Sequence, residues 1–247
     1  MKKSPSDINV HLGIGYRNSV AAVERKDIIV AIDVLRCSSS IVTALANGAR
    51  AVIPSSTLSE ARSLAKRHDA ILAGERKGKR PKGFELGNSP LEFKSEVVQG
   101  RIVVLTTTSG TKAIVLGKKG RGVLVGSFLN LDATVRRVCQ LAEASGSGVS
   151  LVTAGKRGAF SLEDFLCAGA ISDQLAQNGA ELDDGCLASV HAWRDARSDL
   201  SSALREGLHA RYLASLGFQD DVDFVAKLNL FDIAAVLRRD RIVAVKP

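Results

Sequence analysis

Six apolar runs rich in β-branched residues recur along the chain, with helical patterns between them. The runs cover residues 27–33, 50–55, 69–74, 101–107, 122–128 and 148–155. Nearly every position in them is apolar, which is typical of strands that are covered on both faces. The intervening residues 38–47, 57–67, 110–118 and 130–145 have the three-to-four-residue apolar spacing of helices. This alternation predicts an α/β fold, a three-layer α/β/α sandwich with a mostly parallel sheet.

The rest of the chain changes character and is mainly helical. Its pattern predicts a helix over 162–177, a long helical stretch over 186–216 that breaks near Arg197–Ser201, a short helix over 220–228, and strands near 231–237 and 241–245. No long polar linker precedes this tail. We therefore predict one domain over 1–247, which can include a C-terminal helical subdomain at about 180–230.

Several classes of protein are disfavoured by the composition. No segment approaches the roughly 18 uninterrupted apolar residues that a membrane-spanning helix needs. The start, MKKSPSDINV, has Ser, Pro and Asp where a secretory signal has its apolar stretch, so we expect a cytoplasmic protein with no membrane contact. The four cysteines and four histidines are scattered and have no metal-ligand spacing, which disfavours a zinc site.

The positive charge of the chain is concentrated in one stretch. The formal net charge is +8, and residues 62–82 contain eight Lys or Arg against two acids. This excess suggests an anionic partner, either a small polyanion or a nucleic acid. The 4% aromatic content and the absence of aromatic residues over 68–83 leave no platform for stacking bases. A solvated loop without a partner remains an alternative.

Chemistry-bearing side chains follow the predicted strands at the points where these strands end. Asp33 and Arg36 follow the first run, Glu75 and Arg76 follow the third, and Glu163 and Asp164 open the helix after the last run. Ligands bind parallel sheets at the carboxyl ends of the strands, so these groups are candidates for one site. Asp33 lies too early to be a simple N-cap of the next helix, which favours a metal ligand or nucleophile over a cap.

Two of these segments also have ordinary structural explanations. The stretch TTTSGTKA (106–113) lies at a strand-to-helix junction, where free backbone N–H groups attract anions, yet hydroxyl residues are also common helix caps. Ser161 and Asp164 have the spacing of a capping box, which accounts for Asp164 but not for Glu163. Two adjacent acids facing Asp33 would instead suit Mg²⁺, which prefers oxygen ligands.

Taken in order, these segments resemble the 2-phosphosulfolactate phosphatase family of coenzyme M biosynthesis. The resemblance lies in IDVLRCSSSIVTALANGA (32–49), LAGERKGKRPKGFELGNSPLEF (72–93), VVLTTTSGTKAI (103–114), VGSFLN (125–130) and LVTAGKRGAFSLEDFLCAGAI (151–171). It implies an α/β/α fold and a phosphoric monoester hydrolase that converts 2-phospho-3-sulfolactate to 3-sulfolactate and phosphate with Mg²⁺. Such a substrate carries about four negative charges, since the second phosphate pKa is about 6, and the basic stretch then requires no nucleic acid.

We assign provisional roles to the candidate residues on this basis. Asp33, Glu75 and Glu163 are the predicted catalytic residues, and Asp33, Glu163 and Asp164 the predicted metal ligands. The predicted substrate-binding residues are Arg36, Arg76, Lys79, Asn88, Ser89, Thr107, Thr108, Ser109, Gly110 and Thr111. Asn88 and Ser89 precede a proline, so they fit a simple turn equally well.

Three questions stay open at this point. The attack can be by water or by Asp33 through a phospho-enzyme. The substrate can be another small phosphorylated hydroxy acid, and the protein can instead be a non-catalytic polyanion- or nucleic-acid-binding protein. Assembly into a homo-oligomer is compatible with the sequence.

Overall fold

A computed structural model describes residues 8–247 and has one ten-stranded sheet in the order β4-β5-β3-β10-β9-β6-β2-β7-β1-β8. The strands are β1 (Asn9–Ile14), β2 (Ile28–Ile32), β3 (Ala51–Ser55), β4 (Ile71–Gly74), β5 (Ile102–Thr106), β6 (Gly122–Gly126), β7 (Val149–Thr153), β8 (Glu181–Leu182), β9 (Ala234–Arg238) and β10 (Arg241–Val245). All six predicted apolar runs form strands. Their continuous apolar character reflects burial on both faces, as in β2, where every residue is buried.

Helices connect most of these strands. They are α1 (Asn18–Glu24), α2 (Cys37–Ala46), α3 (Leu58–His68), α4 (Ser95–Val98), α5 (Gly110–Gly117), α6 (Leu131–Ser145), α7 (Leu162–Gln177), α8 (Asp184–Ala196), α9 (Leu200–Glu206), α10 (Leu208–Ser215) and α11 (Gln219–Val225). Short 3₁₀ helices cover Pro90–Glu92, Phe128–Asn130 and Arg197–Asp199.

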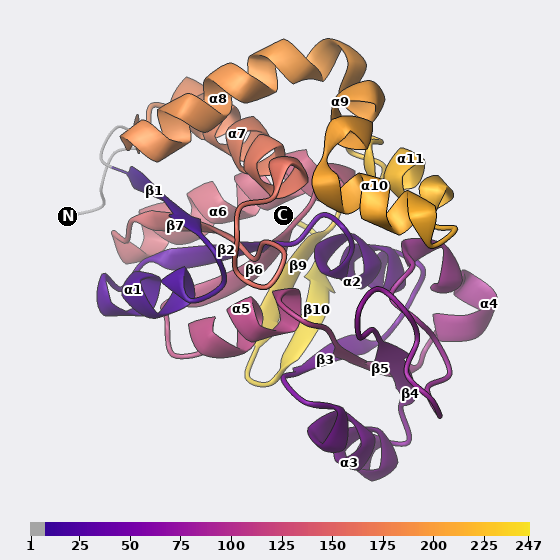
Figure 1. Cartoon of the computed structure of the whole chain (residues 1–247). Coiled ribbons are helices and arrows are strands. Elements are labelled where there is room, and N and C mark those ends of the chain that lie inside the picture. Colours follow the sequence, from indigo (N-terminus) through magenta and orange to yellow (C-terminus); the bar gives the residue numbers. More distant parts are fainter. Residues whose placement is uncertain (1–7) are drawn as a thin grey trace.

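Helices cover both faces of the sheet, as the α/β/α prediction requires. Alternate residues of β2 show the two faces: Ile29 and Ala31 pack with α1, α2 and α5, whereas Ile28 and Ile32 pack with α6, α7 and α8. At the other end of the sheet, α3 covers the outer face of β3 to β5. Figure 1 shows α3 at the β4 end and α7 and α8 above the β1 end. The predicted fold class is confirmed.

The sheet consists of two parallel halves joined by an antiparallel hairpin. Strands β4, β5 and β3 pair in parallel, and so do β6, β2, β7, β1 and β8. The hairpin β9–β10 lies between the halves and is antiparallel to both neighbours (Figure 1). The parallel strands of one half therefore point opposite to those of the other half, as judged from the strand pairing across the sheet. The sequence predicted both hairpin strands but not this reversal.

The halves are arranged alike around the hairpin. In one half β5 lies between β3 and β4, and in the other β2 lies between β6 and β7. Helices α5 and α2 follow the two central strands and share one core. Neighbouring strands rotate by roughly 20–25°, so the five steps from β5 to β2 accumulate a rotation on the order of 100°. This twist turns the carboxyl ends of the opposed halves toward one side of the molecule.

Some elements differ from the sequence prediction. Strand β1 and helix α1 were not predicted, because LGIGYRN combines glycines with polar residues and hides both patterns. The long tail helix does break at Arg197–Asp199, and it breaks again at Gly207. Within residues 8–247, no helix is both long and apolar enough to cross a membrane. The prediction of a single domain over 1–247 stays a prediction.

Candidate functional site

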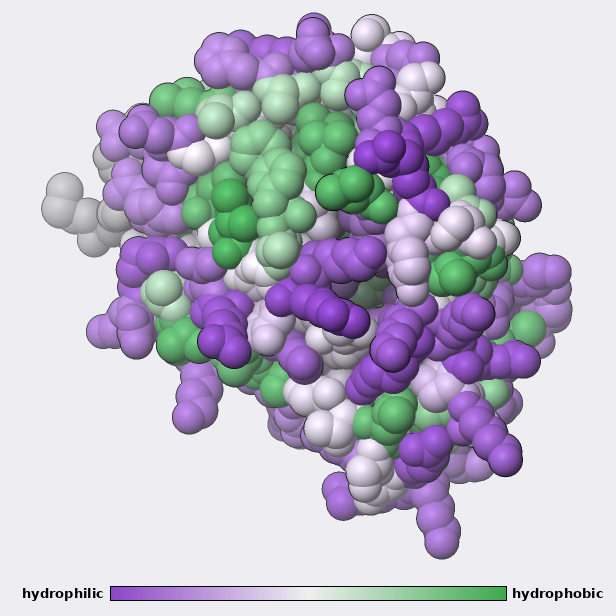
Figure 2. All heavy atoms as spheres, viewed as in Figure 1, coloured by the Kyte–Doolittle hydropathy of each residue, from purple (hydrophilic) through white to green (hydrophobic). Residues whose placement is uncertain are grey.

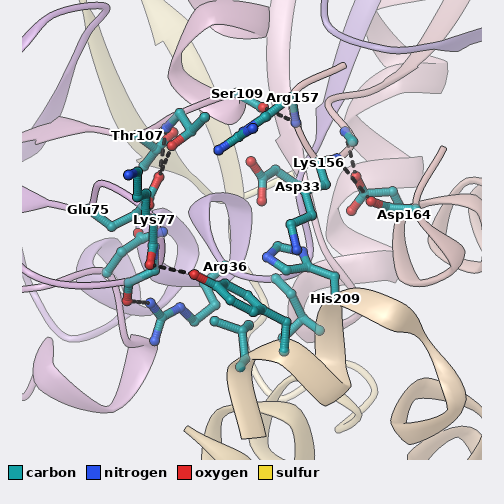
Figure 3. Close-up of a pocket in the computed structure, with 18 of the residues that line it drawn as sticks. Asp33, Arg36, Glu75, Lys77, Thr107, Ser109, Lys156, Arg157, Asp164 and His209 are labelled. Carbon is teal, nitrogen blue, oxygen red and sulfur yellow. Dashed lines mark hydrogen bonds between the residues drawn. The ribbon is translucent and has the colours of Figure 1, made fainter. Parts of the chain in front are cut away.

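One cavity of about 750 Å³ opens where the two halves of the sheet converge. The segments after β2, β4, β5 and β7 line it, and α10 contributes His209, Tyr212 and Leu213. Figure 3 shows Asp33 in the middle, with Glu75 and Lys77 on one side and Lys156 and Arg157 on the other. In the view of Figure 2, hydrophilic side chains surround a hollow in the centre of this face.

The predicted site residues divide into two groups. Those that line the cavity are Asp33, Arg36, Glu75, Arg76, Asn88, Thr107, Thr108, Ser109 and Asp164. Those that do not line it are Lys79, Ser89, Gly110, Thr111 and Glu163. The sequence therefore predicted nine of the nineteen residues that line the cavity, most of them from their place after a strand.

Asp33 follows β2 directly and is held by the start of α2. Its Oδ1 accepts a hydrogen bond from the Cys37 N–H at 3.2 Å, and its own N–H donates to Ser38 Oγ at 2.7 Å. Burial raises the pKa of the Asp33 carboxyl from 3.8 to about 6, against the opposing effect of nearby His209. No donor among residues 8–247 bonds to Asp33 Oδ2, so this oxygen is the uncommitted one at the bottom of the cavity.

The turn between β5 and α5 packs against Asp33. Gly110 is required there, because a Cβ at this position would lie 2.4 Å from Asp33 Oδ2. Thr107 and Thr111 form reciprocal hydrogen bonds: the Thr107 N–H donates to Thr111 Oγ1 and the Thr111 N–H donates to Thr107 Oγ1, both at 3.1 Å. Among the described residues, no acceptor pairs with the N–H groups of Ser109 and Gly110. These two amides begin α5 and remain available for an anion.

Two buried carboxylates perform the same structural task in the two halves. Glu75 accepts from the Thr108 N–H at 2.7 Å with Oε1 and from the Gly78 N–H at 2.8 Å with Oε2. Asp164 accepts from the Val34 N–H at 2.8 Å with Oδ1 and from the Gly155 N–H at 3.0 Å with Oδ2. Each carboxylate thus links the loop after an outer strand to the turn after the central strand.

These hydrogen bonds change the expected roles of Glu75 and Asp164. Both oxygens of each side chain are occupied by backbone N–H groups, which leaves little capacity for a metal or a proton transfer. The raised pKa of Asp164 comes from burial first and then from Glu163 and Asp33, with the two backbone bonds opposing it. We therefore regard Glu75 and Asp164 as positioning residues.

Two tight hairpins form the rim of the cavity. Lys77 and Gly78 have φ values of 54° and 77°, and Arg157 and Gly158 have 57° and 86°. Positive φ at both central residues is the signature of a type I′ turn. Isolated bridges close the hairpins, Arg76 to Lys79 in the first and Lys156 to Ala159 in the second. We refer to residues 76–79 and 156–159 as the two rim hairpins.

Arg36 lies in the cavity wall but is already neutralised. Its Nη1 donates to Asp221 Oδ2 at 2.6 Å, its Nη2 donates to the Gly78 carbonyl at 2.7 Å, and its guanidinium lies 4.1 Å from the centre of the Phe218 ring. Ser89 belongs to the same network and donates to Asp221 Oδ1 at 2.5 Å. This network ties α11 to a rim hairpin, so Arg36 and Ser89 act mainly through structure.

Two further predicted residues lie outside the cavity for local reasons. Lys79 is exposed at the far side of its hairpin, where its backbone pairs with Arg76. Glu163 is buried, and its Oε1 lies 3.0 Å from His209 Nδ1 on α10. Glu163 thus orients a cavity residue and does not face Asp33 as a ligand.

Sequence reasoning missed the contribution of α10 and of the second rim hairpin. Lys156 and Arg157 follow the run 148–155, so the strand-end rule was sufficient to find them. His209 and Tyr212 had no such signal, because they lie in the tail helix and reach the cavity only through the tertiary fold. Tyr212 donates from its hydroxyl to the Lys77 carbonyl at 2.9 Å, and Lys156 Nζ lies 4.0 Å from the centre of its ring.

The donor set limits how Mg²⁺ can bind. Within residues 8–247, no group of three or more His, Cys, Asp or Glu side chains is arranged to hold a metal. Asp33 has a free carboxylate oxygen in the cavity, whereas both oxygens of Asp164 accept backbone N–H groups. Glu163 does not line the cavity, and its Oε1 contacts His209. Mg²⁺ commonly uses one or two carboxylates, with waters and substrate phosphate completing the shell. The residues therefore fit an ion held by Asp33 and substrate, and not the predicted set of three carboxylates.

The fold and cavity define an α/β protein with a half-buried acid beneath a basic rim, an arrangement suited to small anionic esters. The chain belongs to the 2-phosphosulpholactate phosphatase family, whose model matches residues 16–240. Members of this family are named as phosphoric monoester hydrolases, and the predicted family is confirmed.

Relatives in other bacteria support this assignment. A protein from Thermotoga petrophila named "Probable 2-phosphosulfolactate phosphatase" is 43% identical over 209 residues, which cover 84% of this chain and 88% of that protein. Proteins of the same name from Thermotoga maritima and Caldanaerobacter subterraneus are 42% and 38% identical, covering 88% and 87% of their own lengths.

Proposed function

We propose that this protein hydrolyses 2-phospho-3-sulfolactate to 3-sulfolactate and phosphate with the help of Mg²⁺. The observation that carries this proposal is the free carboxylate oxygen of Asp33 at the bottom of a cavity with a cationic rim. An anionic ester would be repelled by the Asp33 carboxylate alone, so the arrangement favours a cation between Asp33 and the phosphate. The family membership and the names of the relatives support the choice of substrate.

The chain's own residues divide the work of phosphate-ester hydrolysis. Asp33 would hold the metal, which supplies positive charge next to the transferring phosphoryl group. The N–H group of Ser109, which lines the cavity, would bind a phosphoryl oxygen, aided by the positive end of α5. Arg76 lines the same wall, where its Nη2 is anchored to Thr106 Oγ1 at 3.0 Å.

His209 is the candidate for protonating the leaving oxygen. It lines the cavity from α10, and its contact with Glu163 Oε1 fixes the ring orientation. A carboxylate hydrogen-bonded to one ring nitrogen leaves the other nitrogen for a second partner. The alkoxide of a hydroxy acid is a poor leaving group, so a proton donor at this place would accelerate the reaction.

Phosphate release from the purified protein tests the proposal. The substrates are 2-phosphosulfolactate, phosphoglycerate and p-nitrophenyl phosphate, each with Mg²⁺, with Mn²⁺ and with chelator. Metal-dependent release that favours phosphosulfolactate is expected. Faster phosphate release from phosphoglycerate would indicate that the substrate is another phosphorylated hydroxy acid. No phosphate release with either metal would favour a binding protein without catalytic activity.

Several associated predictions are part of this proposal. They are a place in coenzyme M biosynthesis, a cytoplasmic location and the lack of a nucleic-acid partner. The excess of Lys and Arg is sufficiently explained by a small substrate with several negative charges. Assembly into a homo-oligomer stays a prediction from the sequence.

A further inference from the structure

The two rim hairpins have the same unusual combination of backbone and side chain. The first central position of each type I′ turn, Lys77 or Arg157, is a long basic residue with positive φ. Asn, Asp and Gly are preferred there, because other residues cost about 1 kcal/mol or more in this conformation. A basic residue placed at both tips despite this cost suggests a function for the charge.

The tips lie on opposite sides of the cavity and are held in place. Figure 3 shows Lys77 across the cavity from Arg157, with Asp33 between the hairpins. Glu75 anchors the first hairpin through the Gly78 N–H. The second is anchored by Ser109, whose Oγ accepts from the Arg157 N–H at 3.0 Å. The backbone of both tips is therefore held in place, so the two side chains start from set positions at the rim.

Both tip cations lack an acidic partner within the described part of the chain. Neither Lys77 nor Arg157 forms an ion pair there, although both line the cavity and are exposed. Arg36 in the same wall is fully paired with Asp221 and cannot serve a ligand in this way. The free positive charge at the rim thus comes from the hairpins.

We propose that Lys77 and Arg157 bind the acid groups of the ligand other than its phosphate, one from each half of the sheet. This inference rests on the proposed function, in which those groups are a sulfonate and a carboxylate. A ligand with both acids can reach the two tips while its phosphate lies near Asp33. A ligand with a single acid group engages only part of this arrangement.

Direct binding measurements separate this inference from turnover. We would titrate 3-sulfolactate, and separately inorganic phosphate, into the wild type and into the double variant Lys77→Asn/Arg157→Asn by calorimetry. Asn suits the left-handed position, and Asn-Gly favours a type I′ turn, so the hairpins are preserved. We expect the variant to bind 3-sulfolactate about tenfold more weakly, because it lacks two solvent-exposed ion pairs with the ligand. Phosphate affinity should change less than twofold.

A matched control removes the same charge elsewhere. Lys119→Ala/Arg121→Ala also lowers the net charge by two, at exposed positions beyond the end of α5 that is distant from the cavity. This variant should bind 3-sulfolactate like the wild type. Equal weakening by both variants would mean a nonspecific charge effect and would overturn the inference.

The outcomes also distinguish the two proposals. Unchanged 3-sulfolactate affinity in the hairpin variant, with normal hydrolysis of phosphosulfolactate by the wild type, would overturn only the role of the tips. Weaker 3-sulfolactate binding by the hairpin variant, without any hydrolysis of phosphosulfolactate by the wild type, would overturn only the proposed function. Tip-dependent binding should also weaken with salt, because both partners are exposed to solvent.

Discussion

Asp33→Asn should make the protein more stable while it removes activity. The pKa of the Asp33 carboxyl is raised from 3.8 to about 6, chiefly by burial. Between these pH values the folded protein holds a proton that the unfolded chain has lost. The free energy of unfolding of the wild type therefore falls as pH rises through this window. Asn occupies the same volume without the charge and does not incur this loss.

The size of the effect follows from the two pKa values. At about 1.4 kcal/mol per pKa unit, the ionised carboxylate costs the wild type about 3 kcal/mol once the pH exceeds 6. At pH 4 the same two pKa values leave a difference of less than about 1 kcal/mol. The variant should thus exceed the wild type in stability by up to about 3 kcal/mol at pH 8, and by much less at pH 4.

Urea unfolding at both pH values, with chelator present, measures this difference. Asp195→Asn in α8 is the control, because Asp195 is exposed and its replacement should change stability by less than about 0.5 kcal/mol. If Asp33→Asn is no more stable than the wild type at pH 8, or if its advantage is the same at pH 4, the electrostatic account of Asp33 is wrong.

Three further changes probe other parts of the account. Arg36→Ala should cost about 3–5 kcal/mol in urea unfolding, because it leaves Asp221 buried without its partner; a loss below 1 kcal/mol would contradict the structural role of Arg36. Gly110→Ala should reduce kcat at least tenfold, because the added Cβ would press against Asp33, whereas the Cβ of the control Gly122→Ala meets open space and should leave kcat unchanged. Equal kcat values for the two variants would contradict this geometry. His209→Ala should lower kcat on phosphosulfolactate by about 10²–10⁴ but much less on p-nitrophenyl phosphate, whose leaving group needs no proton; equal losses on both substrates would exclude the proton-donor role.

Most of the fold can be predicted from the sequence, because the strands are buried on both faces and nearly every residue in them is therefore apolar. It also indicates the site, since Asp33, Glu75 and Thr107–Thr111 all follow such strands. The reversal between the two halves depends on where the last hairpin inserts, and nothing local to residues 231–245 specifies that position.

The roles of individual acids are harder to obtain from sequence. Asp33, Asp164 and Glu163 are all acids that come after a buried strand, yet their oxygens have different partners. Asp33 Oδ2 has no donor among the described residues, both oxygens of Asp164 accept backbone N–H groups, and Glu163 Oε1 contacts an imidazole. These partners come from other segments of the chain. The same applies to Arg36, whose partner Asp221 lies 185 residues further along the chain.

The most direct test of the central claim is phosphate release from 2-phosphosulfolactate by the wild type and by Asp33→Asn, side by side with Mg²⁺. We expect metal-dependent turnover by the wild type and a loss of at least a thousandfold in the folded variant, in line with the removal of a group at the reacting centre. Turnover by the variant within tenfold of the wild type would show that the reaction does not depend on Asp33 and would contradict the account.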